Sequence, residues 1–166
     1  WQAFSEQTVK ALGEMFGYAR TMAYTFHPDY HGEVTAEYLN QPDLEPFLGL
    51  HYPASDIPPQ ARRLYVLQLV RVIEDVDGPT VHLLGSVPDC GPAPALDLSF
   101  AHRRAVSPVH LEYTRNMGVA ATATVSVVQR ERLTGMFVMH HTEPRPLGLS
   151  DRLALATFSR FASFVA

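Results

Sequence analysis

Four short segments, far apart in the sequence, carry side chains that could bind a polar ligand. They are residues 52–58 (YPASDIP), Arg71, residues 107–113 (SPVHLEY) and the pair His140–His141. An arginine binds a carboxylate through two parallel, charge-assisted hydrogen bonds. A neutral imidazole can donate and accept a hydrogen bond at once. These residue types therefore suit the recognition of a polar, acidic ligand.

Catalysis is a poorer interpretation of the same chain. The sequence has no nucleophile with an evident base partner, no glycine-rich phosphate loop and no pair of carboxylates. Those are the arrangements that nucleophilic, phosphoryl-transfer and acid–base chemistry need. We therefore expect a binding domain without enzyme activity.

Each candidate residue also has an ordinary structural explanation. Asp56 stands two residues before Pro58 and could cap the helix that follows. A single arginine or histidine is most often a surface residue, and a buried tyrosine most often belongs to the core. Arg71 is the strongest candidate, because it interrupts a valine-rich strand where an unpaired charge would be costly.

Two pairs of histidines raise the question of a metal site, and we expect none. Consecutive residues of a strand point to opposite faces, so His140 and His141 cannot readily share one ion. His27 and His31 have the i, i+4 spacing of a helical metal site. A proline and a glycine beside them disfavour a continuous helix there.

The composition is that of one globular domain. The chain has 166 residues, of which 46% are hydrophobic and 18% are charged. Its net charge of −4 argues against nucleic-acid binding, and no apolar run has the length that a membrane span needs. The one cysteine, Cys90, excludes an internal disulfide and fits a reducing compartment, so we expect a cytoplasmic location.

The hydrophobic patterns predict the elements that would position these segments. Strands are predicted at residues 20–26, 33–38, 70–73, 119–128 and 133–142, and helices at residues 5–18, 43–50, 58–69, from 107 onward, and 151–166. Residues 74–106 are rich in proline and glycine and lack periodicity. This order predicts an α+β fold in which helices cover an antiparallel sheet.

Together and in this order, the four segments resemble the chromophore-binding GAF domain of a bacterial phytochrome. The resemblance runs from about residue 16 to about residue 146. It implies a GAF fold with a central antiparallel sheet of five to six strands, flanked by helices, in which residues 74–106 form a long lasso-like loop. It also implies that residues 1–166 are one GAF domain of a longer, multidomain photoreceptor, which fits a chain that begins at Trp1 without Met.

The resemblance implies that the ligand is a bilin, a linear tetrapyrrole, and gives the candidate residues their roles. Asp56 would face the pyrrole nitrogens, and the proline after Ile57 would hold that turn extended so that a backbone carbonyl projects inward. Two arginines would bind the propionates, and His140 would hold the carbonyl of the terminal ring. The full set of implied contacts is Met22, Tyr24, Tyr52, Asp56, Ile57, Pro58, Tyr65, Arg71, Arg104, Ser107, His110, Tyr113, Met117, Thr122, Thr124 and His140.

The resemblance also bears on how the bilin is attached. Plant and some cyanobacterial phytochromes attach it to a cysteine at the position of Val109, and bacterial phytochromes use a cysteine that precedes this domain. Cys90 stands at neither position. The expected chromophore is therefore biliverdin, bound to this chain without a covalent bond.

The implied function is that of a red/far-red photosensor that signals to a downstream output module such as a histidine kinase. The implied partners are adjacent PAS and PHY domains and a second copy of the chain, in a homodimer through the terminal helices. The alternative, from a different class of protein, is a GAF module that no longer binds bilin and acts as a dimerisation or interaction domain. That alternative would use the apolar surface of residues 151–166.

Overall fold

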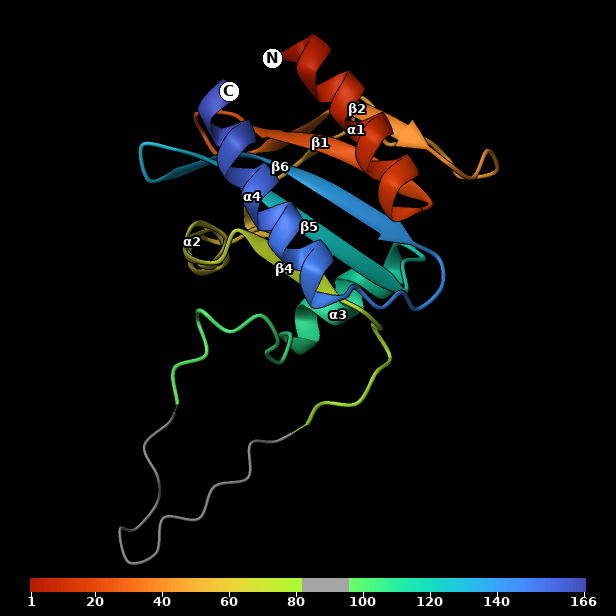
Figure 1. Ribbon diagram of the computed structural model, residues 1–166, viewed down its shortest axis with the longest axis vertical. Coiled ribbons are helices and arrows are strands. Elements are labelled where there is room, and N and C mark those ends of the chain that lie inside the picture. Colours follow the sequence, from red (N-terminus) through yellow and green to blue (C-terminus); the bar gives the residue numbers. More distant parts are fainter. Residues whose placement is uncertain (82–95) are drawn as a thin grey trace, which may run out of the picture.

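The fold is built around one sheet, as Figure 1 shows. The computed structural model describes residues 1–81 and 96–166. The sheet has six strands in the order β3-β2-β1-β6-β5-β4, and all of its pairings are antiparallel. The expected α+β class and strand number are thereby confirmed. In chain order the elements are α1 (Gln2–Phe16), β1 (Arg20–Phe26), β2 (Gly32–Leu39), β3 (His51–Tyr52), the 3₁₀ turn η1 (Ala54–Asp56), α2 (Pro59–Leu67), β4 (Val70–Ile73), α3 (Pro108–Asn116), β5 (Ala121–Gln129), β6 (Arg132–His141) and α4 (Leu149–Val165).

Two hairpins form the middle of the sheet. β1 pairs with β2, with a bulge between Ala23 and Tyr24, and β5 pairs with β6. β1 also pairs with β6, so the two hairpins lie edge to edge. Arg130 and Glu131 connect β5 to β6 with φ angles of 48° and 62°, which suits the tight turns that match the twist of a hairpin. Both strand pairs predicted from alternation are therefore confirmed.

α1 and α4 lie across one face of the sheet (Figure 1). Their apolar sides meet alternate strand residues in a single buried cluster, and the rings of Phe4 and Phe161 approach to 6.2 Å between the two helices. Each fully buried aliphatic or aromatic side chain contributes about 1.5–3 kcal/mol to folding. The fully or nearly fully buried members are Val9, Leu12, Tyr18, Ala23, Ala36, Val70, Val72, Ala123, Val125, Val127, Phe137, Met139, Leu147, Leu155 and Ala162.

The second face of the sheet is covered differently. The hydroxyl of Ser126 donates a hydrogen bond to the carbonyl of Tyr65 at 2.8 Å, which ties α2 to β5. Ser126 alternates with Val125 and Val127 of the core cluster, so α2 lies on the face opposite α1 and α4. This second face is the one that carries the candidate site.

The predicted helix at residues 43–50 is wrong. The segment forms turns rather than a helix, and β2 binds much of its backbone. The carboxylate of Glu37 accepts hydrogen bonds from the backbone N–H groups of Phe47 at 2.9 Å and Leu48 at 3.0 Å. Gly49 donates to the carbonyl of Val34 at 2.9 Å. The segment then enters β3, a short strand that the hydrophobic pattern did not predict.

The long connection after β4 is irregular wherever the structure describes it, at residues 74–81 and 96–106. Cys90 and the middle of the predicted lasso fall on residues 82–95, outside the described residues. Across the described part of the chain, no helix combines the length and apolar character needed to span a membrane.

Candidate functional site

Strand alternation brings the predicted polar residues onto one face of the sheet. In the register of β5 and β6, Thr122 lies opposite His140 and Thr124 lies opposite Val138. On the other side of β5, Arg71 lies opposite Thr124. Thr122, Thr124, Val138 and His140 therefore share one face, and Arg71 joins them.

His140 is buried on this face, with 8% of the residue exposed. Burial lowers its pKa to about 3, and the positive Arg20 and the nearby His110 act in the same direction. The ring is therefore neutral at pH 7. Its Nδ1 atom is buried and has no hydrogen-bond partner among the described residues, although buried polar atoms normally have one. A ligand with a polar group at this point would satisfy it.

His141 points away from the site, as predicted for the next residue of a strand. Its Nδ1 atom accepts a hydrogen bond from the backbone N–H of Ala19 at 3.1 Å. Its ring packs edge-on against Tyr18, with 6.1 Å between ring centroids. His141 is thus a structural residue of the opposite face, and the two histidines do not share a site.

Arg71 and Arg104 form a cationic end of the site. Burial, followed by the positive charge of Arg104, lowers the pKa of Arg71 to about 10. Arg71 donates from Nη2 to the carbonyls of Arg104 and Ala105, at 3.0 and 3.3 Å. None of the ion pairs among the described residues involves either arginine. Two neighbouring guanidinium groups without a carboxylate favour the binding of an anion.

His110 lies at this cationic end. Burial lowers its pKa, and the positive charge of Arg71 acts in the same direction. Its position in α3 follows from the predicted start of that helix, where Pro108 is the first residue. The charge of His110 is one of the causes that lower the pKa of His140.

Asp56 ends the 3₁₀ turn before α2 and turns its carboxylate toward α3. The hydroxyl of Tyr113 donates to Oδ2 of Asp56 at 3.3 Å. Burial, followed by the charge of Asp56, raises the pKa of Tyr113. The alternative explanation of Asp56 as a helix cap is wrong, because α2 begins after Pro58 without any side-chain cap. The carboxylate instead faces Tyr113 of α3.

A group of aromatic side chains lies next to Asp56. The rings of Tyr24 and Tyr52 lie 6.0 Å apart, and burial together with the charge of Asp56 raises the pKa of Tyr24 to about 12. Met22, two residues earlier in β1, is buried and lies opposite Val138 of β6. Gly32 makes this packing possible, since a Cβ there would meet the Tyr24 ring at 1.8 Å.

Arg62 holds the turn that carries Asp56, and sequence reasoning missed it. Its Nη1 atom donates to the carbonyls of Ala54 at 3.2 Å and Ile57 at 2.5 Å. Its guanidinium lies over the ring of Tyr30, at 4.3 Å from the centroid. The carbonyl of Ile57 therefore already accepts one hydrogen bond from the chain itself. A lone arginine on a helix gives no sequence signal for such a role.

Arg20 and Glu37 form a second pair that sequence reasoning missed. Their side chains are only 5% and 4% exposed, and Nε of Arg20 lies 3.0 Å from Oε1 of Glu37. Nε has no aligned hydrogen-bond partner in the described structure, so charge rather than a directed bond holds this contact. The guanidinium also stacks on Phe47, at 3.6 Å from the ring centroid. The sequence signal that could have indicated this pair was a charged residue, Arg20, at the start of the predicted strand β1, where the strand is buried.

Three other residues predicted to contact the ligand, Tyr65, Met117 and Ser107, lie in different surroundings. Burial raises the pKa of Tyr65, and the positive Arg71 opposes the shift. Met117 and His140 line a small space of about 20 Å³, on the order of one water molecule. Ser107 is exposed and makes no side-chain capping bond.

A larger hollow, of about 670 Å³, lies away from these residues. It is formed by the turn after β1, the turn between β5 and β6, and the end of α4, and its lining includes Phe26, Arg132 and Phe164. It contains none of the residues predicted to bind a ligand. Its open rim and lack of convergent buried polar groups make it a poorer site than the sheet face.

The comparisons with known proteins agree with this geometry. The sequence matches the GAF domain family over residues 1–166, and the chain belongs to that family. Within it, the chain is homologous to bacteriophytochromes. It is 42% identical over 155 residues to a bacteriophytochrome of Pseudomonas aeruginosa, a match that covers 93% of this chain and 21% of the relative. A bacteriophytochrome of Xanthomonas campestris pv. campestris is 45% identical over 144 residues, covering 83% and 22%.

The fold agrees with the same class. The chromophore-binding domain of Stigmatella aurantiaca phytochrome P1 superposes with a TM-score of 0.92 at 35% identity, covering 99% of this chain and 53% of that one. The resemblance inferred from the four segments is thereby confirmed. The chain spans about a fifth of the length of the two bacteriophytochromes that it matches.

Proposed function

We propose that the chain is the bilin-binding photosensory domain of a red/far-red light receptor, without catalytic activity of its own. The observation that carries the proposal is the buried Nδ1 atom of His140, which has no partner among the described residues, on the same face as Arg71 and Arg104. A bilin has carbonyl groups, pyrrole N–H groups and two propionates. The face offers a complementary group for each.

The residues would act on a bound bilin as follows. Arg71 and Arg104 would bind the propionates, and the buried hydroxyls of Thr122 and Thr124 would lie beside them. His140 would bind the carbonyl of the terminal ring. When bound, the bilin supplies light absorption and isomerisation at a methine bridge, and the chain orients it and excludes water.

The remaining contacts would set the shape of the pocket. Asp56 would face the pyrrole nitrogens from the turn that Pro58 extends, and His110 would contact the pyrrole system. Tyr24, Tyr52 and Tyr113 would form the aromatic wall around the ring that isomerises, with Met22 and Met117 as softer packing. The remaining proposed contacts are Ile57, Tyr65 and Ser107.

Binding is proposed to be non-covalent, with biliverdin as the chromophore. Val109, at the attachment position of plant phytochromes, cannot form a thioether, and its side chain is exposed. We expect denaturing electrophoresis of the loaded chain to show no zinc-dependent bilin fluorescence in the protein band. A fluorescent band that disappears in Cys90→Ser would contradict this and assign the attachment to Cys90.

The function is tested by producing the chain together with a haem oxygenase, so that biliverdin is made in the same cells. We expect the purified chain to have a red or far-red absorption band. A colourless chain with an intact fold would favour the alternative of an interaction domain that no longer binds bilin.

That alternative rests on α4. Several large apolar side chains of this helix are exposed, namely Leu149, Leu153, Phe161, Phe164 and Val165. A surface of this kind favours contact with another protein surface.

We also propose that α1 and α4 form a homodimer contact in the longer receptor. The domain would lie next to PAS and PHY domains and signal to a downstream module such as a histidine kinase.

The two histidines of β6 provide a matched test of the proposed facing. We expect His140→Ala to shift or abolish the bilin band, because its ring occupies the site face and is buried. We expect His141→Ala to leave the band in place, since its Nδ1 atom bonds to Ala19 on the other face. Absorption spectra of both variants, compared with the parent chain, decide the matter. The reverse result would contradict the assignment.

A further inference from the structure

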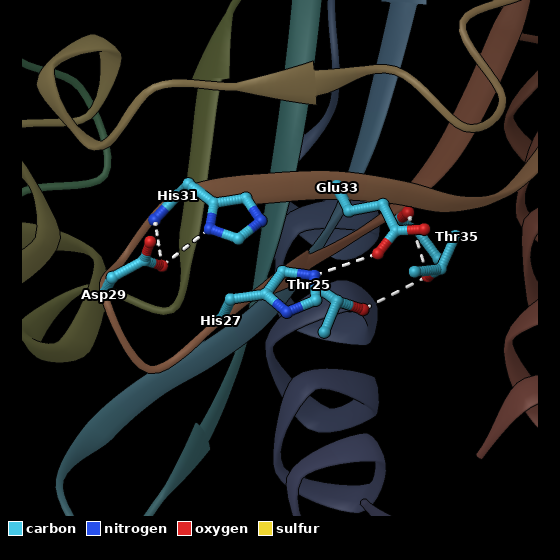
Figure 2. Close-up of polar contacts among 7 residues, drawn as sticks. Thr25, His27, Asp29, His31, Glu33 and Thr35 are labelled. Carbon is cyan, nitrogen blue, oxygen red and sulfur yellow. Dashed lines mark hydrogen bonds and ion pairs between the residues drawn. The ribbon is translucent and has the colours of Figure 1, made fainter.

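Three histidines meet at one end of the sheet, next to the tyrosines of the proposed bilin pocket, because His51 directly precedes Tyr52. His27 follows β1, His31 precedes β2, and His51 begins β3. One ring nitrogen from each lies within 4.8 Å of those of the other two. Figure 2 shows how the side chains of His27 and His31 approach each other across the hairpin.

The hairpin explains how this proximity arises without a helix. The backbone N–H of His27 donates to the carbonyl of His31 at 2.9 Å, which closes the turn between β1 and β2. On the other edge of β2, Glu33 lies opposite His51 of β3. The expectation that no continuous helix joins His27 and His31 is right, but a turn brings their rings together all the same, and β3 adds a third.

Two carboxylates orient the first two imidazole rings. Nε2 of His27 lies 2.9 Å from Oε2 of Glu33, and Nδ1 of His31 lies 2.6 Å from Oδ1 of Asp29 (Figure 2). Because a carboxylate can only accept, each ring donates through that nitrogen. The lone pairs of His27 Nδ1 and His31 Nε2 therefore remain available. A carboxylate behind each ligating histidine is the usual support of a metal site.

We propose that His27, His31 and His51 form a site for a divalent transition metal, with zinc as the representative ion. Imidazole nitrogens suit zinc, copper and nickel, and three histidines leave a fourth position open to water. The charges of Asp29 and Glu33 complement the cation. None of the three histidines is among the proposed bilin contacts.

Binding requires a small rearrangement that the surface position permits. The rings of His27 and His31 are stacked 4.2 Å apart and only 4° from parallel, whereas a ligating lone pair lies in the plane of its ring. Zinc–nitrogen bonds of about 2.0–2.1 Å also need the three nitrogens closer together by roughly an ångström. The side chains of His27 and His31 are 35% and 33% exposed, and His51 is exposed, so rotation about their side-chain bonds meets little packing.

The proposal is tested by calorimetric titration of Zn²⁺ into the chain prepared without bilin and without a histidine tag, since both bind zinc. We expect one ion per chain. His27→Gln, His31→Gln and His51→Gln should each lower the affinity at least tenfold, and Glu33→Gln by roughly ten- to a hundredfold, as second-sphere partners do. His102→Gln, which changes an exposed histidine of another region, should bind as the parent does.

A second measurement separates loss of the ligand from loss of the fold. We expect saturating Zn²⁺ to raise the melting temperature of the parent chain and not that of the triple variant His27→Gln, His31→Gln, His51→Gln, while both melt cooperatively in chelator. The proposal is overturned if the parent binds no ion in a one-to-one ratio. It is equally overturned if His51→Gln binds like the parent or if His102→Gln loses as much affinity as the three ligand variants.

Discussion

Glu37→Gln is expected to lower the free energy of unfolding by about 3–5 kcal/mol, the usual cost of removing one partner from a buried ion pair. The substitution keeps the shape of the side chain but leaves the charge of Arg20 buried without its counter-ion, 3.0 Å away in the parent. It also weakens the acceptor for the backbone N–H groups of Phe47 and Leu48. Urea unfolding followed by circular dichroism measures the loss.

Glu14→Gln is the matched control for that experiment. Glu14 pairs with Lys10 at 4.0 Å on α1, and both side chains are more than half exposed. Exposed pairs of this spacing contribute about 0.3–0.5 kcal/mol, so this variant should unfold almost like the parent. If Glu37→Gln and Glu14→Gln lower the free energy of unfolding by the same amount, the pair between Arg20 and Glu37 is hydrated in solution, and its description as a buried ion pair is wrong. Adding Arg20→Met to Glu37→Gln should recover part of the loss, because it removes the stranded charge.

Arg71→Ala is expected to weaken bilin binding about ten- to a hundredfold. A hydrogen bond to a charged group is worth about 1.5–3 kcal/mol, and this substitution removes the charge-assisted bonds proposed for one propionate. Titration of biliverdin, followed by the growth of the red absorption band, gives the affinity. Arg71→Lys should fall between the parent and Arg71→Ala, since it keeps the charge but loses the planar fork.

Two controls make the result on Arg71 interpretable. Arg63→Ala removes an exposed arginine of α2 and should leave the affinity unchanged. A thermal melt of Arg71→Ala checks the fold, because Arg71 also binds the carbonyls of Arg104 and Ala105. An Arg71→Ala chain that melts like the parent and binds biliverdin equally well would remove Arg71 from the proposed site.

Elements with a strong period could be predicted from the sequence, and elements set by tertiary contacts could not. The alternation of β5 and β6 and the helical spacing of α1 and α4 are properties of the segments themselves. Residues 43–50 looked helical because their own pattern was the only information available. Their conformation is instead set by Glu37 and Val34 of β2, and no local pattern reports such a partner.

The candidate site shows the same division. Thr122, Thr124 and His140 could be placed on one face because strand alternation and hairpin register are local rules. Arg62 could not be found, since its contacts with Ala54 and Ile57 depend on how α2 returns to the preceding turn. The histidine cluster was missed for a related reason, because His51 reaches it through the pairing of β3 with β2.

The proposed bilin face and the packing of the terminal helices share a single layer of strands. His140 is covalently joined to Met139, which is buried in the cluster beneath α1 and α4, and Arg71 lies between Val70 and Val72 of the same cluster. Protein interiors are close-packed and barely compressible, so a backbone displacement at His140 or Arg71 must also displace these neighbours. A displacement on the proposed bilin face would therefore reach the packing beneath α1 and α4 without intermediate residues, because one peptide bond joins the residues of the two faces.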